Sequence, residues 1–183
     1  MCKMKYMGDF KKIIIAFVLF FAFFSLKAQS EIVEKVTVEG NQRIALETII
    51  IFGDIQIGKD YESSDINLLI KKLYETSFFS DISVKLENNR LNIKVTENPI
   101  VNSIVFNGEK AKKFKEAIRE LLTLREKGSF IRTNIKNDVN QIKAFYRTLG
   151  YYFVTIEADV EKLQKNRVNI VYTIDKGKKA KIS

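Results

Sequence analysis

Apolar and polar residues alternate along several short segments, which are separated by segments with helical spacing. Val36 and Val38 alternate with polar residues and run into Gly40-Asn41, which predicts a strand that ends in a turn. A helix is expected over Ala45 to Phe52, with Gly53 placed to end it. A second helix is predicted after the suitable N-cap residues Ser63 and Ser64, because apolar residues then recur every three or four positions, at Ile66, Leu69, Ile70, Leu73 and Tyr74.

A β-hairpin is predicted to follow this helix. Its first arm alternates between apolar Ile82, Val84, Leu86 and polar Ser83, Lys85, and its second arm alternates through Leu91, Ile93 and Val95. Asn88-Asn89 lies between the arms, and asparagine tolerates the positive φ that a tight hairpin turn requires. The first unit, residues 31–98, is therefore expected to have the order β-α-α-β-β.

The same order of patterns recurs after Pro99, the only proline in the chain. The expected elements are a strand from Ile100 to Phe106, a helix from Lys112 to Leu122, a helix marked by Ile135, Val139, Ile142 and Phe145, a strand from about Tyr152 to Val160, and a strand through Val168, Ile170, Tyr172 and Ile174. The spacing repeats as well, since Gly40 and Gly108 lie 68 residues apart. We therefore expect a second unit over residues 99–177, and residues 178–183 resemble the first strand of a third.

Each unit has one apolar sheet face and two amphipathic helices to cover it. This pattern predicts the α+β class, with a three-stranded sheet covered by two helices in each of two domains. A three-stranded sheet has two edge strands, whose unpaired N–H and C=O groups are either protected or available to another extended chain.

The first thirty residues differ from the rest of the chain. Four lysines precede an unbroken apolar run from Ile13 to Phe24, and Ala28 follows shortly after it. A basic start, a short apolar core and a small residue are typical of a secretory signal peptide, whereas a membrane-spanning helix needs about twenty apolar residues. We therefore expect a signal peptide over residues 1–28, cleavage after Ala28, and an exported protein.

Composition argues against most catalytic machinery. The chain has no histidine, and its one cysteine, Cys2, lies before the apolar run. After cleavage no thiol or imidazole remains for nucleophilic catalysis, disulfides or zinc binding, so we expect no enzyme, no metal and no cofactor. Five lysines and one aspartate lie in residues 1–28, which leaves 26 basic and 21 acidic residues, a mild positive excess.

Three other groups of side chains have both a functional and a structural interpretation. Acid pairs such as Asp159 with Glu161 could share acid and base roles, but nothing in the sequence forms a pocket around them. Basic tracts at 110–115 and 176–181 could attract phosphates or anionic headgroups, yet a solubilising surface is the simpler interpretation, and no nucleic-acid partner is expected. Aromatic residues near helix ends are expected in the core rather than at a binding surface: Tyr74, Phe78, Phe79, Tyr146, Tyr151 and Tyr152.

Several motifs recur between the units. In the first they are VTVEGNQRI at 36–44, LYETSFFSDI at 73–82 and IKVTENPI at 93–100, and in the second IVFNG at 104–108, FYRTLGYY at 145–152 and NRVNI at 166–170. These motifs resemble the POTRA repeats of outer-membrane assembly factors of the BamA family. Ser77 departs from the glycine usual before the aromatic pair, and Glu109 from the asparagine common after Gly108. The resemblance implies two tandem POTRA domains, in an N-terminal fragment that lacks the family's barrel.

The family resemblance also implies a function. A protein of this kind binds unfolded outer-membrane proteins at the periplasmic face of the outer membrane of a Gram-negative bacterium, with assembly-complex lipoproteins and periplasmic chaperones as further partners. We expect the client to pair with a sheet edge, because β-augmentation makes few demands on client sequence. The candidate edges are the first arms of the two hairpins, represented by Ile82, Ser83, Val84, Lys85 and Leu86 and by Val154, Thr155, Ile156, Glu157 and Ala158.

Two alternatives stay open at this stage. A membrane-anchored division-site scaffold of the FtsQ type would carry a POTRA domain behind an uncleaved apolar anchor at Ile13 to Phe24. Two-partner secretion transporters and the TamA-like autotransporter assembly factors also join POTRA domains to a barrel. The mature N-terminus would distinguish the first alternative, and the coding sequence beyond Ser183 would distinguish the others.

Overall fold

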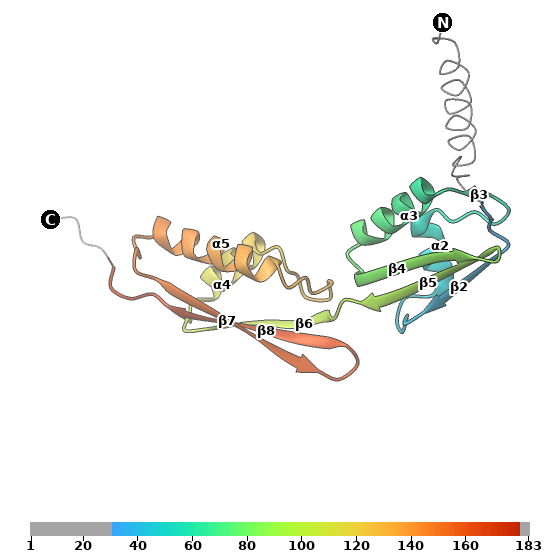
Figure 1. The fold of residues 1–183 in the computed structure, drawn as a ribbon. Coiled ribbons are helices and arrows are strands. Elements are labelled where there is room, and N and C mark those ends of the chain that lie inside the picture. The colour runs from blue at the N-terminus through green and yellow to red at the C-terminus, as the bar shows by residue number, and fades with distance from the viewer. Residues whose placement is uncertain (1–30, 180–183) are drawn as a thin grey trace, which may run out of the picture.

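The computed structural model describes residues 31–179, which form two α+β domains placed end to end (Figure 1). Each domain has its own hydrophobic core, one within residues 33–95 and the other within residues 101–174. In both, the helices cover one face of a sheet and the other face is open (Figure 1). The expected signal peptide with its cleavage site at Ala28, and residues 180–183 of the expected third repeat, lie outside the described residues.

The first domain has the predicted strand and helix order, with a small addition. Its elements are β1 (Glu31–Ile32), β2 (Lys35–Glu39), α2 (Leu46–Gly53), β3 (Asp60–Tyr61), α3 (Ser63–Glu75), β4 (Phe79–Glu87) and β5 (Arg90–Glu97). The main sheet has the order β2-β5-β4, with β2 parallel and β4 antiparallel to the central β5. β1 and β3 form a separate two-stranded pair, which the sequence pattern did not predict.

The second domain repeats this topology. Its elements are β6 (Ile100–Asn107), α4 (Lys112–Leu121), α5 (Asn134–Thr148), β7 (Thr155–Leu163) and β8 (Arg167–Asp175), and its sheet has the order β6-β8-β7. Again the first strand is parallel and the second antiparallel to the central one. Within residues 31–179, no helix is both long and apolar enough to cross a membrane.

The central strands and the second helix of each domain supply most of the buried surface. Leu91, Ile93 and Val95 alternate inward along β5 and meet Leu69 and Leu73, which α3 places one turn apart. In the second domain, Val168, Ile170, Tyr172 and Ile174 of β8 meet Ile142 and Tyr146 of α5 in the same way. The apolar periodicity noted in the sequence therefore corresponds to two separate cores.

Gly40 and Gly108 occupy the same corner of the two domains. Both have positive φ, +84° and +80°, and a Cβ atom on either would clash with a backbone carbonyl of the neighbouring central strand. That carbonyl belongs to Val95 in the first domain and Ile174 in the second. Only glycine fits such a position, so the 68-residue spacing between these two glycines reflects a structural equivalence.

The hairpin turn at Asn88-Asn89 is confirmed, and two predicted helix ends are wrong. Asn88 and Asn89 both have positive φ, as a tight two-residue turn requires. Gly53 does not end α2 through a left-handed conformation; Asp54 does, with φ +52°, while buried Gly53 makes room for Ile55. The N-cap of α3 is Glu62 rather than Ser63 or Ser64, since the helix begins at Ser63. The Asp65 side chain accepts a hydrogen bond from the Glu62 N–H (3.1 Å), as in a capping box.

The joint between the domains consists of Asn98 and Pro99. Asn98 is fixed to the first domain: its N–H donates to the carbonyl of Phe78 (2.8 Å) and its Nδ2 donates to the carbonyl of Ser77 (3.0 Å). Pro99 is fixed to the second domain, because its carbonyl accepts a hydrogen bond from the N–H of Phe130 (2.7 Å). Proline fixes its own φ and restricts the preceding residue, so the joint has little freedom.

Candidate functional site

The outer edge of β4 carries the backbone groups that could receive another strand. β4 is an edge strand of its sheet, and from Asp81 to Glu87 it pairs in regular antiparallel register with β5. In such a ladder, alternate residues direct their N–H and C=O groups away from the partner strand. The Ile82 N–H donates to the Tyr74 hydroxyl (3.1 Å), which shows that Ile82 is one of the outward residues.

Val84 and Leu86 have the same orientation as Ile82, because they follow it at intervals of two with no irregularity between them. Among residues 31–179, no other group forms a hydrogen bond to the outward N–H or C=O of Val84 or Leu86. The edge is therefore closed at Ile82 and open at the two residues beyond it.

An apolar stripe of α3 runs beside this open edge. Ile66 and Ile70 are half-buried and Tyr74 is 42% exposed, and these three lie four residues apart on one side of the helix. α3 packs over β4 (Figure 1), where the Val84 and Leu86 side chains are also half-buried. Ser83 and Lys85, by contrast, are exposed and alternate to the opposite sheet face. A chain added to β4 would therefore meet apolar side chains on one face and polar ones on the other.

The edge strand β7 is the second candidate, and it differs in character. Thr155 and Glu157 are exposed, Ile156 is buried and Ala158 is half-buried. Val154 was expected within this strand, but it lies just before β7 and is buried in the core at 5% exposure. The chain turns at Gly150, with φ +88°, so the strand begins at Thr155 rather than near Tyr152.

Acidic residues lie along the open face of β7. Glu157, Asp159 and Glu161 are all exposed and alternate with core-facing residues, so they share one face of the sheet. None of them forms an ion pair within the described residues 31–179. Charged residues near a strand edge are one way in which proteins discourage unwanted pairing.

The edge of β6, in contrast, is closed by the second domain itself. The segment after α4 runs alongside it: the Val101 N–H donates to the Gly128 carbonyl (2.9 Å), and the Lys127 N–H donates to the Val101 carbonyl (2.7 Å). Further along, the Ile104 N–H donates to the Glu126 carboxylate (3.0 Å) and the Ile104 carbonyl accepts from Arg119 (2.8 Å). This protection depends on tertiary contacts and left no recognisable sequence pattern.

The buried acids are engaged in holding loops in place. Burial alone would raise the pKa of the Glu97 carboxyl, but hydrogen bonds from the N–H groups of Ile44, Gln42 and Arg43 hold that pKa below its usual range. Asp138 of α5 accepts hydrogen bonds from the N–H groups of Thr123 (2.6 Å) and Leu124 (3.1 Å), which lie in the loop after α4.

Glu109 and Lys176 form the corresponding contact in the second domain. Lys176 Nζ lies 2.8 Å from the Glu109 carboxylate, which also accepts hydrogen bonds from the Ala111 N–H (2.8 Å) and the Tyr146 hydroxyl. Burial would raise the pKa of the Glu109 carboxyl, but Lys176 and the other donors hold it below its usual range. Burial, reinforced by Glu109, raises the pKa of the Tyr146 hydroxyl far above its usual value.

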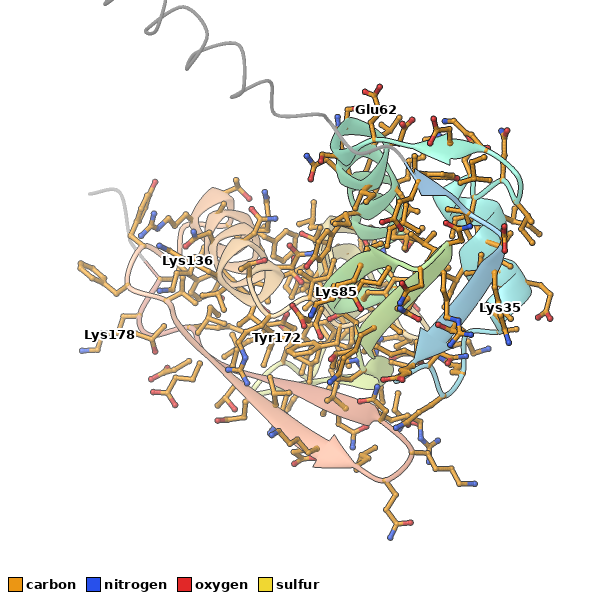
Figure 2. The ribbon with its side chains drawn as sticks, turned by 45° about the vertical axis from the view of Figure 1, so that its right-hand side comes forward. Lys35, Glu62, Lys85, Lys136, Tyr172 and Lys178 are labelled. Atoms are coloured by element: carbon orange, nitrogen blue, oxygen red, sulfur yellow. The ribbon has the colours of Figure 1, made fainter. Side chains whose placement is uncertain are left out.

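Tyr172 is also buried in the core of the second domain. It lies on β8 between the sheet and the helices of the second domain (Figure 2), and its hydroxyl donates to Asp138 (3.2 Å). Burial raises the pKa of the Tyr172 hydroxyl, and Asp138 adds to the effect. Across the described residues there is no cluster of three or more acidic, cysteine or histidine side chains that could hold a metal ion.

The aromatic residues only partly follow the expectation of core packing. Phe79 and Tyr146 are buried, as predicted, but Tyr74 and Tyr152 are 42% and 59% exposed. Tyr74 lies at the end of α3, where its hydroxyl can reach the edge of β4, and Tyr152 lies in the turn before β7. Sequence spacing placed Tyr74 near a helix end and Tyr152 at the start of a strand, but it could not show which way either side chain faces.

Comparison with known proteins supports the fold and finds proteins of similar sequence. Residues 99–177 match the POTRA family, described as a surface antigen variable number repeat. The outer membrane protein assembly factor BamA of Neisseria meningitidis serogroup B is 32% identical over 154 residues, which cover 82% of this chain and 19% of that protein. The protein of the same name from Neorickettsia risticii is 26% identical over 148 residues, covering 81% of this chain and 20% of that protein.

One solved structure gives a direct comparison of the fold. The N-terminal domain of Omp85 from Thermosynechococcus elongatus matches with a TM-score of 0.53 and 14% identity, over 81% of this chain and 64% of that chain. At this identity the match supports the fold alone. The predicted resemblance to POTRA repeats is confirmed, and the chain spans about a fifth of the length of the curated relatives it matches.

Proposed function

We propose that this chain, which has the POTRA fold and sequence similarity to BamA proteins, is the periplasmic part of an outer-membrane β-barrel assembly factor that binds unfolded barrel proteins. Both similar proteins are named outer membrane protein assembly factors, and this chain aligns with about a fifth of each. We extend the role in outer membrane protein assembly to residues 31–179 of this chain. It involves recognition of polypeptide rather than bond chemistry.

The open edge of β4 carries this proposal. Val84 and Leu86 direct backbone donors and acceptors outward, and an extended client adds to such an edge through main-chain hydrogen bonds. Because every polypeptide has the same backbone groups, the affinity depends little on client sequence. The apolar stripe formed by Ile66, Ile70 and Tyr74 favours clients whose side chains alternate between apolar and polar, as strands of a membrane barrel do.

β4 is favoured over the two edges of the second sheet. β6 is closed by the segment after α4 and by Glu126 and Arg119. β7 is unprotected in the described residues, but its exposed acidic face makes it the second candidate. We therefore assign the client first to Ile82, Ser83, Val84, Lys85 and Leu86, and second to Thr155, Ile156, Glu157 and Ala158.

Substitution of Val84 by proline tests the assignment. Val84 directs its N–H away from β5, so proline removes a donor offered to the client without removing a hydrogen bond of the native sheet. Titration of the chain with peptides from barrel strands, followed by amide NMR shifts, should show weaker binding by about threefold to tenfold, equivalent to one lost hydrogen bond. Val84→Thr is the matched control, because it keeps the branched shape and the donor.

The outcomes of this titration are distinguishable. Circular dichroism and thermal melting first establish that each variant is folded. Weaker binding by folded Val84→Pro, with nearly normal binding by Val84→Thr, supports the β4 edge. If folded Val84→Pro binds as tightly as Val84→Thr and the unmodified chain, β4 is rejected. Shifts at β7 in that case would place the site in the second domain.

Export and the remaining partners form a separate part of the proposal. The basic start and apolar run before Ala28 support delivery across the inner membrane, and the BamA similarity supports contacts with assembly-complex lipoproteins and periplasmic chaperones. Mass spectrometry of the exported protein should find a mature chain that begins near Gln29. An intact N-terminus retained in the membrane would favour the anchored scaffold instead.

A further inference from the structure

A cavity of about 370 Å³ lies where the two domains meet. Ser80 and Asn98 line it from the first domain, and Phe130, Arg132 and the β7–β8 hairpin line it from the second. The cavity is independent of the open part of the β4 edge, since neither Val84 nor Leu86 is among its lining residues. Pockets of about 300 to 1,000 Å³ are typical of small-molecule sites, and such sites are common between domains.

Three cations surround this cavity without a counter-ion. Arg132, Lys162 and Arg167 line it, and no aspartate or glutamate is among its lining residues. None of the three forms an ion pair with another residue between 31 and 179. Arg167 contacts only neutral oxygens, the side-chain oxygen of Asn102 (3.3 Å) and the carbonyl of Gln164 (3.4 Å). Positive charges gathered at a concave surface attract an anion.

The other side chains of the cavity are apolar or carry amides. Phe130 and Val168 are buried at 6% and 3% exposure, and half-buried Leu163 lies at the end of β7. Asn98 and Asn166 contribute amide groups, although the Nδ2 of each already donates to a backbone carbonyl. The cavity therefore combines a cationic rim with an apolar wall, and a ligand that satisfies both needs a negative head on an apolar body.

We propose that the cavity binds a small amphiphilic organic anion, with one carboxylate or phosphate head and a short apolar body. The head lies among Arg132, Lys162 and Arg167, where charge-assisted hydrogen bonds are available. The apolar body lies against Phe130 and Leu163. An inorganic anion lacks the body and a neutral amphiphile lacks the charge, so each satisfies only half of the site.

Occupancy of the cavity would also affect the joint. The lining residues come from both domains, and Asn166 of the second domain already donates to the Glu97 carbonyl of the first (3.1 Å). A ligand in contact with both sides adds further links across Asn98-Pro99. The bound form should therefore have a more restricted angle between the domains than the free form.

Titration with octanoate and with octyl phosphate, each below its critical micelle concentration, tests the proposal. The full chain is used, and amide and side-chain NMR signals report binding at each residue. We expect saturable shifts at Asn98, Phe130 and Asn166 with both probes. Sodium sulfate, inorganic phosphate and octanol should each bind at least about tenfold more weakly, because each lacks one half of the required chemistry.

The variant pair Arg132→Gln and Arg167→Gln should each weaken octanoate binding by about tenfold, since each removes one charged contact. Both side chains are exposed, so the fold should tolerate the change. Lys136→Gln is the matched control: Lys136 is exposed on α5 (Figure 2) but does not line the cavity, so binding should change by less than about twofold. Lys162→Gln provides a second test at the β7 side of the rim.

Three outcomes would overturn the proposal. Equal shifts with octanol would show that charge plays no part, and equal affinity for sulfate or phosphate would show a simple anion site. Absence of saturable shifts at Asn98, Phe130 and Asn166 with all probes would show that the cavity takes no such ligand. Binding of octyl phosphate but not octanoate would support the proposal only in its phosphate form, and the reverse only in its carboxylate form.

Discussion

Glu97 and Lys176 occupy the same position in the two domains and carry opposite charges. Each follows, by two residues, the central-strand carbonyl that faces the equivalent glycine, Gly40 or Gly108. Glu97 accepts hydrogen bonds from the loop after Gly40, whereas Lys176 pairs with Glu109, directly after Gly108. Both contacts fix the end of the central strand to the loop that follows the first strand. The two domains therefore share this contact between strand end and loop, but the residue at the strand end is an acid in the first domain and a lysine in the second.

The Glu97 contact predicts a dependence of stability on pH. The folded pKa of this carboxyl lies below its ordinary value of 4.5, so its contribution is present above about pH 4.5 and is lost as the pH falls through the folded pKa. Glu97→Gln should lower the free energy of unfolding of the first domain by about 1–3 kcal/mol at pH 7, because three N–H donors lose a charged acceptor. Urea titrations at pH 7 and pH 3, followed by first-domain NMR signals, measure both effects.

The difference between the two proteins should shrink as the pH falls from 7 to 3, because below about pH 4.5 the unfolded chain binds a proton at this carboxyl while the native pKa is lower. Glu116→Gln provides the control, since Glu116 is exposed on α4 and pairs only with exposed Lys112. A constant difference from pH 7 to pH 3 would contradict the role of the charge.

Tyr74 is predicted to limit the length of the open β4 edge. Tyr74→Phe removes the hydroxyl that accepts the Ile82 N–H, so one more backbone donor becomes available to a client strand. The free energy of unfolding should fall by about 0.5–1.5 kcal/mol, because the hydrogen bond from the Ile82 N–H to Tyr74 is lost. Peptide affinity should rise by about twofold to tenfold, because the peptide can accept that hydrogen bond instead. Calorimetric titration and thermal melting of the same variant measure these effects. Unchanged or weaker binding would show that Ile82 lies outside the client site.

Leu73 is predicted to be essential to the first core. It is completely buried on α3, so Leu73→Ala should cost about 2–5 kcal/mol through lost burial and a residual cavity. Leu68→Ala, five residues earlier on the same helix and half-exposed, should cost less than about 1 kcal/mol. Chemical denaturation of both variants makes the comparison, and equal losses would contradict the placement of the core.

The first domain should fold without the second. Its buried apolar residues form a cluster within residues 33–95, separate from that of the second domain. A protein of residues 31–98 should therefore give dispersed amide NMR signals and a cooperative melting transition. A collapsed, undispersed spectrum would show that contacts across the Asn98-Pro99 joint are required for folding.

Local patterns in the sequence predicted most of the fold. Alternation in the hairpin arms and the spacing of Leu69 and Leu73 identified buried positions, because burial on one face imposes these periods directly. The two-residue strands β1 and β3 are too short to show a period, and they were missed. At the end of α2, Asp54 took the left-handed position because Gly53 was needed for close packing against Ile55, which depends on tertiary structure.

The candidate site was predictable only in part. The strand order expected for this fold placed β4 and β7 at edges, but the state of each edge depends on contacts between residues far apart in sequence. Tyr74 closes the β4 edge at Ile82, whereas Glu126 and Arg119 close the β6 edge at Ile104. Such contacts require the orientation of each side chain, which spacing alone does not provide.

The closed edge of β6 also bears on how copies of this protein could associate. A sheet with two free edges can join neighbours on both sides and so extend into a growing fibre. The second domain has a protected edge from Val101 to Ile104, and only β7 remains on the other side. Two copies that paired β7 to β7 would leave no free edge on either second-domain sheet, so this sheet alone cannot propagate a polymer.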